Sequence, residues 1–86
     1  MATEQQFTEA QARVKTLSSS PGNDTLLSLY ALFKQATVGD VEGKRPGMLD
    51  LKGRAKFDAW AGKKGVSKAA AIDQYVALVD RLVAQK

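Results

Sequence analysis

Apolar residues recur along this chain at the helical spacing of three or four, and no segment alternates apolar and polar residues as a half-buried strand would. The clearest apolar stripe lies near the carboxyl end, where it covers about one third of a helical wheel. The pattern predicts four helices and an all-α fold. The stripe of the fourth helix consists of Ile72, Tyr75, Val76, Val79, Leu82 and Val83.

Capping signals predict where the first two helices begin. Thr3 and Gln6 have the spacing of a capping box, and Ser20 followed by Pro21 suits an N-cap with proline at the first helical position. We therefore expect one helix after Thr3 and a second after Ser20 that ends near Gly39. Their apolar stripes are Phe7, Ala10, Val14 and Leu17 in the first helix and Leu26, Leu29, Tyr30 and Phe33 in the second.

The third helix is predicted from near Asp50 to near Gly62, after which Gly65 and Ser67 break and recap the chain before the fourth. Gly53 is unusual inside this helix, because glycine costs roughly 1 kcal/mol there relative to alanine. A close approach of a neighbouring group would account for it.

A connection of about a dozen residues without helical period, 37–49, separates the second and third helices. Antiparallel neighbours in small bundles are usually joined by about 2 to 8 residues, so a longer connection is expected to cross the bundle and link helices that run the same way. The sequence thus predicts a four-helix up-down-down-up bundle with a long crossing loop, folded as a single domain over residues 1–86.

The composition excludes most catalytic and metal chemistry. Cysteine and histidine are both absent from the 86 residues, which removes disulfides, Cys/His zinc sites, thiol nucleophiles and the commonest general base. No apolar run approaches the roughly 18 residues of a membrane span, and no leader pattern opens the chain. We expect a cytoplasmic, monomeric binding protein with no catalytic residue, metal or cofactor and no stable membrane insertion.

Positive charge is concentrated in one segment. The formal net charge is +4, yet residues 44–68 carry eight basic side chains against two acidic ones. A one-sided positive field attracts anions, whether nucleotide, nucleic acid or phospholipid. Tyr30, Phe33 and Lys34 share one helical face by their i, i+3, i+4 spacing, and Lys52 and Lys56 repeat the i, i+4 interval. These clusters indicate an anionic, partly aromatic ligand.

Three blocks of sequence resemble the acyl-CoA-binding protein family, the small intracellular carriers of long-chain fatty acyl-CoA. They read FKQATVGD at 33–40, RPGMLD at 45–50 and KGRAKFDAW at 52–60, in the family's order and spacing. The resemblance implies an acyl-CoA carrier and pool former, with long-chain acyl-CoA as its partner. The similarity continues outward at Phe7, Val14, Lys15, Leu17, Ser67, Tyr75, Val76 and Leu82.

The resemblance also implies particular ligand contacts. The family positions matching Lys15, Lys34 and Lys56 contact the phosphates of coenzyme A, and the position of Lys52 contributes nearby. Those of Tyr30 and Tyr75 stack on the adenine nucleotide and offer hydroxyls to it. The full candidate acyl-CoA site is Lys15, Tyr30, Ala31, Leu32, Phe33, Lys34, Lys52, Lys56 and Tyr75.

Two positions depart from the family pattern. Phe33 stands where the family often has tyrosine, so a hydroxyl contact is lost while ring packing is kept, and Phe57 replaces a frequent tryptophan. Taken without the family, Tyr30 and Tyr75 would be read as core aromatics, and single exposed lysines as solvated side chains. Trp60 is expected in the core.

Two other functions fit the composition. An isoelectric point near 9.6 and the basic third helix would suit a small nucleic-acid-binding module, although no helix-turn-helix pattern is present. A protein-interaction bundle with an incidental basic face is the second. An isomerase or transferase acting on acyl-CoA is a more distant alternative, because no suitable general base is evident in the sequence. The acyl-CoA carrier, which would bind no nucleic acid, accounts for more of the sequence than any of these alternatives.

Overall fold

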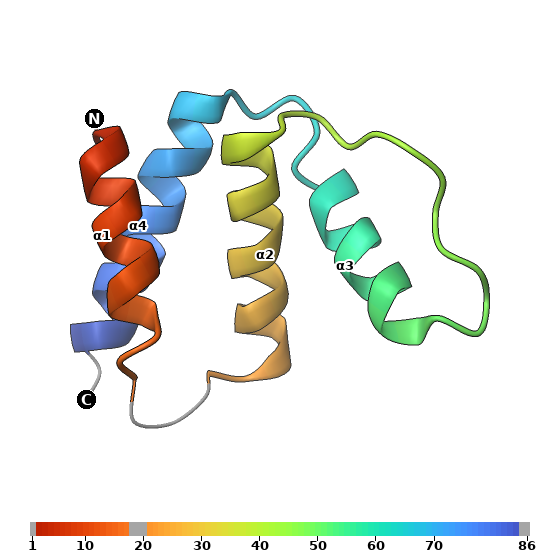
Figure 1. Cartoon of the computed structure of the whole chain (residues 1–86), viewed down its shortest axis with the longest axis horizontal. Helices are drawn as coiled ribbons and strands as arrows, with labels where there is room; N and C mark the ends of the chain where they lie inside the picture. Colours follow the sequence, from red (N-terminus) through yellow and green to blue (C-terminus); the bar gives the residue numbers. More distant parts are fainter. Residues whose placement is uncertain (1, 18–20, 85–86) are drawn as a thin grey trace.

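The computed structural model describes residues 2–17 and 21–84, which form four helices and, within those ranges, no strand. Figure 1 shows that α1 and α4 run in one direction while α2 and α3 run in the other, so the predicted up-down-down-up arrangement is confirmed. The long connection carries the chain from the end of α2 across to the start of α3. The helices are α1 (Glu4–Val14), α2 (Asn23–Thr37), α3 (Leu51–Ala61) and α4 (Lys68–Ala84).

The start of α1 is the predicted capping box. The Gln6 N–H donates to Thr3 Oγ1 over 3.1 Å, and the Thr3 N–H donates to Gln6 Oε1 over 2.8 Å. These two bonds satisfy two backbone donors that the first helical turn would leave unpaired. The helix ends at Val14, so Leu17 lies beyond it in the connection to α2.

The predicted start of α2 is wrong by two residues. Pro21 precedes the helix instead of opening it, Gly22 is the N-cap, and helical structure begins at Asn23. The Gly22 carbonyl accepts the first helical hydrogen bond from the Leu26 N–H, at 3.0 Å. Asp24 in the first turn adds a favourable charge at the helix N-terminus. Ser20, the expected N-cap, lies outside the described residues.

The starts of α3 and α4 are confirmed. Asp50 caps α3 by accepting the Gly53 N–H at 2.9 Å, and Ser67 caps α4 by accepting the Ala70 N–H at 3.1 Å. A Cβ atom on Gly53 would lie 2.3 Å from Asp50 Oδ2. The capping carboxylate therefore fills the space that a side chain would need, which accounts for a glycine in this first turn.

The core is shared by three helices. α4 packs against α1 and α2, whereas α3 packs against α2 alone. Tyr75 and Val79 of the α4 stripe are buried, and the rest of the stripe packs against them at intermediate exposure. The Phe7 ring meets the Tyr75 ring edge-on, with centroids 5.0 Å apart. The buried cluster is Phe7, Ala10, Leu29, Leu32, Ala36, Ala71, Tyr75 and Val79.

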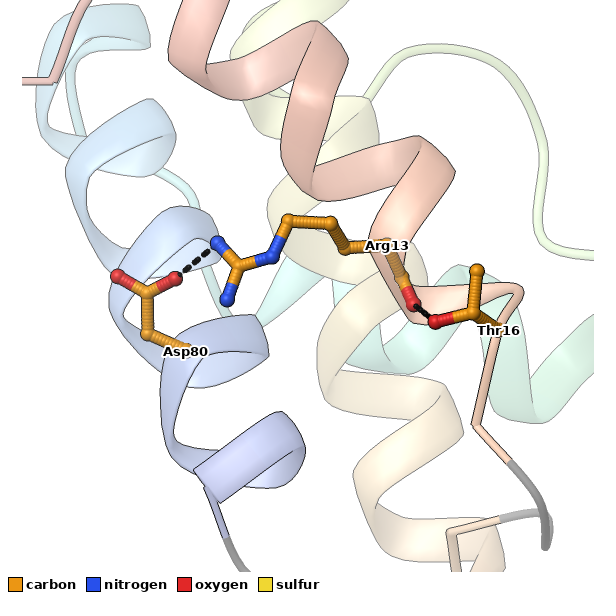
Figure 2. Close-up of polar contacts among 3 residues, drawn as sticks. All are labelled: Arg13, Thr16 and Asp80. Carbon is orange, nitrogen blue, oxygen red and sulfur yellow. Dashed lines mark hydrogen bonds and ion pairs between the residues drawn. The ribbon is translucent and has the colours of Figure 1, made fainter.

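Polar contacts at the surface join α1 to α4. Arg13 Nη1 on α1 lies 2.5 Å from Asp80 Oδ1 on α4, as Figure 2 shows. The same figure shows a local hydrogen bond at the end of α1, which the Thr16 hydroxyl donates to the Arg13 carbonyl. Both charged side chains are about half exposed, so the pair is expected to contribute less than about 1 kcal/mol. The shared apolar core is what holds these two helices together.

The crossing loop is fixed at its beginning. Gly39, at φ 102°, turns the chain out of α2, and its carbonyl accepts the Trp60 indole N–H at 2.8 Å. Asp40 Oδ1 accepts both the Gln35 side-chain amide and the Gly65 N–H at 2.9 Å. Trp60 is only 8% exposed, so its expected burial is confirmed, although it is buried between α3 and α2 and not in the cluster shared by the other three helices. These bonds join the ends of α2 and α3 where the loop departs.

Candidate ligand-binding groove

A groove with a volume of about 420 Å³ lies where the end of α1 meets α2 and α4. Its wall is mainly apolar, because the stripe residues of α2 line it together with Leu17 and Pro21. Three aromatic rings and one lysine complete the lining. The lining residues are Val14, Lys15, Leu17, Pro21, Leu26, Leu29, Tyr30, Phe33 and Tyr75.

The aromatic side of the groove is held by ring contacts with the core. Phe7 lies 6.0 Å from Phe33 and 5.0 Å from Tyr75, measured between ring centroids. Tyr75 is 5% exposed, and its hydroxyl has no hydrogen-bond partner among the described residues. Burial raises the pKa of Tyr75 above 10.0, so the hydroxyl stays protonated at neutral pH and can donate to a ligand.

One of the predicted lysines lines this groove, a second contacts a ring of its wall, and a third lies against Trp60, outside the lining. Lys15 follows the end of α1 and lines the groove itself. Lys56 Nζ lies 5.5 Å from the centroid of the Tyr30 ring, which links α3 to the groove wall on α2. Lys34 Nζ lies 4.9 Å from the centroid of the Trp60 ring. Cation–π contacts of this kind hold an ammonium group near a ring without neutralising its charge.

Among the described residues, no carboxylate forms an ion pair with these lysines. Within residues 2–17 and 21–84 the ion pairs are Arg13–Asp80 and Arg45–Asp58, and neither involves Lys15, Lys34 or Lys56. Lysines that line or neighbour an apolar, aromatic groove without ion-pair partners attract anions toward it. The arrangement suits a ligand with an anionic part and an apolar part.

The remaining predicted site residues lie away from the groove. Lys52 is exposed near the start of α3 and contacts no partner within the described ranges. Ala31 and Leu32 are 1% and 4% exposed, and Leu32 lines a different cleft. The assignment of all nine predicted site residues as acyl-CoA contacts stays a prediction.

The aliphatic end of the groove was missed as part of the site. Leu17, Pro21 and Leu26 line it, yet the sequence assigned the two leucines to core stripes only. Leu26 remains 43% exposed. The available signal was that both leucines flank the break between the first two helices, where a stripe residue can lose its partners.

A larger cleft, of about 680 Å³, opens on another side of α2, against α4. Asp24, Lys63 and Arg81 place both signs of charge in its wall, together with Thr25, Ser28 and Gln74. This cleft has no aromatic ring in its wall and carries the acidic Asp24 beside its two cations, whereas Lys15 is the one charged residue that lines the smaller groove. We take the smaller groove as the candidate site, because ligand chemistry and not volume distinguishes the two.

Two further features bear on the class of protein. No helix among the described residues is long and apolar enough to cross a membrane. The same residues contain no group of three acidic, histidine or cysteine side chains placed to hold a metal ion. The four helices and the aromatic, lysine-lined groove together form a small helical domain with a surface suited to a molecule that has an anionic part and an apolar part.

Comparison with known proteins shows which family this chain belongs to. The family model described as acyl CoA binding protein matches residues 4–79, and the chain belongs to this family. The acyl-CoA-binding protein homolog 1 of Caenorhabditis elegans is 60% identical over 79 residues, which cover 92% of each chain. The acyl-CoA-binding protein homolog of Manduca sexta is 52% identical over 85 residues, 98% of this chain and 94% of that protein.

Solved structures agree with this assignment. The crystal structure of Oryza sativa acyl-CoA-binding protein 2 superposes with a TM-score of 0.91 at 41% identity, covering 95% of this chain and 91% of that one. The solution structure of the yeast acyl coenzyme A binding protein gives a TM-score of 0.75 at 46% identity over 96% of each chain. These comparisons lend no support to the nucleic-acid-binding or protein-interaction alternatives.

Proposed function

We propose that this protein binds one long-chain fatty acyl-CoA per monomer and carries it without catalysis. The observation that carries the proposal is the aromatic groove lined by Lys15, with Lys56 against the Tyr30 ring of its wall, in a chain of the acyl-CoA-binding protein family. Lys34, on the α2 face of Tyr30 and Phe33 by its spacing, adds a third cation, and none of the three forms an ion pair within the described residues. Acyl-CoA has both parts that such a groove requires, a polyanionic nucleotide and a long apolar chain.

The nucleotide would be held by charge and by stacking. Charge-assisted hydrogen bonds from the lysines to phosphate contribute about 1.5 to 3 kcal/mol each. The rings of Tyr30, Phe33 and Tyr75 offer faces and edges for the adenine ring, and the free Tyr75 hydroxyl can donate to a phosphate. Lys34 and Lys56 would move from their aromatic neighbours onto the ligand, at the small cost of a cation–π contact.

The acyl chain would extend from the nucleotide along apolar surface toward the aliphatic end of the groove. Each fully buried methylene contributes about 0.8 kcal/mol, so the head group would set orientation and the tail would rank affinity. We extend the proposal to a cytoplasmic, monomeric protein, folded as one domain over residues 1–86, that does not insert stably into membranes or bind nucleic acid.

Dissociation constants for coenzyme A, octanoyl-CoA and palmitoyl-CoA at one ionic strength test the proposal. The step from octanoyl to palmitoyl has a ceiling of about 6 kcal/mol at ~0.8 kcal/mol per methylene. Incomplete burial and chain ordering lower it, so we expect about 2 to 5 kcal/mol, or tens to thousands of times tighter binding. A flat series below micelle-forming concentrations would mean that only phosphates are bound.

Recovery of the thioester tests the absence of catalysis. Palmitoyl-CoA incubated with the protein should be recovered intact, at a rate of loss equal to the protein-free control. Faster thioester cleavage by independently prepared protein would contradict the carrier assignment. Native mass spectrometry of the same samples should show one ligand per chain.

A further inference from the structure

Three apolar side chains at the start of α3 face solvent. Met48 is 79% exposed, Leu49 is 100% exposed and Leu51 is 75% exposed. We call these three residues the apolar tip. Single exposed leucines are common, but three such side chains within four residues form a patch, and apolar patches on small proteins often mark an interaction surface. None of the three belongs to the core or lines the candidate groove.

The surroundings of the apolar tip are basic. Lys44 and Lys52 flank it in sequence, both are exposed, and neither forms an ion pair within the described ranges. The nearby carboxylates are already engaged, since Asp50 accepts the Gly53 N–H and Asp58 binds the Arg45 guanidinium at 2.7 and 2.9 Å. Residues 44–56 contain five basic side chains against one acidic, a local formal charge of +4.

The apolar tip lies at one edge of the molecule. Figure 1 places the turn from the crossing loop into α3 at the lower right, far from α1 and α4. The first turn of α2, which carries Leu26 and the aliphatic end of the groove, lies at the same lower end. The apolar tip and the aliphatic end of the groove therefore share one end of the bundle.

We propose that the apolar tip docks this protein reversibly on membranes that contain anionic lipids. Met48, Leu49 and Leu51 enter the interfacial layer, and Lys44 and Lys52 approach the lipid phosphates. The charge favours this occupant over a second copy of the chain, because two tips brought together would oppose two segments of charge +4. Three protruding side chains can also enter a fluid interface without a matching pocket.

Docking of this kind is expected to be weak and salt-sensitive. Three apolar residues and two lysines supply far less binding than a membrane-spanning helix, and the electrostatic part falls as ionic strength rises. Since the inference rests on the α3 end and not on the groove, membrane docking can be measured with no acyl-CoA present. Its failure would leave the proposed carrier function untouched.

Flotation with extruded vesicles tests the proposal directly. The full chain without ligand is mixed with phosphatidylcholine vesicles that contain about 30% phosphatidylserine, or with phosphatidylcholine alone. The double variant Leu49→Ser/Leu51→Ser is the test, and Val38→Ser is its matched control, because Val38 is a 43% exposed apolar residue at the other end of α2. Thermal melts establish that both variants fold.

We expect the wild-type chain to float with the anionic vesicles and much less with phosphatidylcholine alone. The double variant should lose about tenfold in partition coefficient through lost apolar burial, whereas Val38→Ser should float as the wild type does. Lys44→Gln should weaken flotation and reduce its dependence on salt. Palmitoyl-CoA affinity measured without vesicles should be unchanged in all three variants.

Three results would overturn the inference. The first is a wild-type chain that ignores anionic vesicles, or a double variant that floats equally well. The second is a loss of palmitoyl-CoA affinity in the double variant without vesicles, which would place the apolar tip in the ligand site. The third is concentration-dependent self-association that the double variant abolishes, which would assign the apolar tip to a second copy of this chain.

Discussion

Helices α1, α2 and α4 share one buried cluster, whereas α3 packs only against α2 and has Trp60 as its one buried residue. The first three are held by apolar contacts such as the Phe7–Tyr75 ring pair. Indole and carboxylate hydrogen bonds instead hold the ends of α3 and the crossing loop. Stability is thus concentrated in one part of the molecule, while α3 supplies exposed lysines and apolar side chains for contacts with other molecules.

The largest expected effect comes from opening the shared core. Phe7→Ala removes a 7% exposed ring that contacts both Phe33 and Tyr75, and buried Phe→Ala changes cost about 3 to 5 kcal/mol. Urea unfolding should show this loss, with Thr8→Ala as a control on the exposed side of the same helix. A loss below about 1 kcal/mol would mean that the three-helix core does not carry the stability.

Removing single lysines around the groove should separate binding from stability. Lys34→Ala and Lys56→Ala are each expected to weaken palmitoyl-CoA binding by more than about tenfold, and to change the free energy of unfolding little, because exposed or half-exposed charges contribute little to folding. Calorimetric titrations beside thermal melts measure both quantities. Lys64→Ala, in the same basic segment, is the control.

Unchanged affinity in both variants would remove Lys34 and Lys56 from the proposed site. An equal loss in Lys64→Ala would instead mean that binding depends on the overall field and not on position. Either result would contradict the assignment of stability to the three-helix core and of ligand binding to Lys34 and Lys56.

Trp60→Phe should loosen α3 while leaving the three-helix core intact. The change removes the indole N–H that donates to the Gly39 carbonyl at 2.8 Å, and a lost hydrogen bond of this kind costs about 1 kcal/mol. Native-state hydrogen exchange should become faster at the amides of α3 than at those of α4. Uniform acceleration across all four helices would show that α3 unfolds only together with the core.

The smallest expected effect is a pH dependence at the loop anchor. Hydrogen bonds from the Gly65 N–H and the Gln35 amide hold the pKa of Asp40 below its usual 3.8. Since the folded-state pKa is depressed, the ionised carboxylate stabilises the fold above pH 3.8, and this contribution is lost as pH falls further. The Arg45 guanidinium lowers the pKa of Asp58 in the same way.

Asp40→Asn should therefore make the acid limb of the stability curve shallower. Urea unfolding midpoints measured from neutral pH down through pH 3.8 provide the comparison. At neutral pH the variant should be slightly less stable than the wild type, and the two should converge in acid. A parallel acid limb in the variant would show that the anchor contributes through geometry and not through charge.

Much of the fold could be predicted from local sequence. The Thr3–Gln6 capping box, the Asp50 cap and the α4 stripe all depend on residues within a few positions of one another, and all were found where expected. The length of the crossing loop was enough to predict that α2 and α3 run the same way. The start of α2 was misplaced because Ser20 and Pro21 were taken as the N-cap and first helical residue, whereas the proline lies before the helix and Gly22 is the N-cap.

The candidate site could be predicted only in part. Spacing placed Tyr30, Phe33 and Lys34 on one face, and the resemblance to a family supplied Lys15, Lys56 and Tyr75 as ligand contacts. The aliphatic end of the groove at Leu17 and Leu26 could not be predicted from the sequence, because its shape depends on how the end of α1 lies against α2. Packing between segments far apart in sequence has no local period that a pattern could reveal.

The sequence by itself determined the helices, their order and the absence of thiol and imidazole chemistry, since propensity, capping and composition are local properties. Only the tertiary structure decided that Lys56 of α3 reaches the Tyr30 ring of α2, and that Leu49 at the start of α3 stays uncovered. An apolar residue in the sequence can be buried or exposed. Which of the two occurs depends on whether another helix packs over it, and at the start of α3 none does.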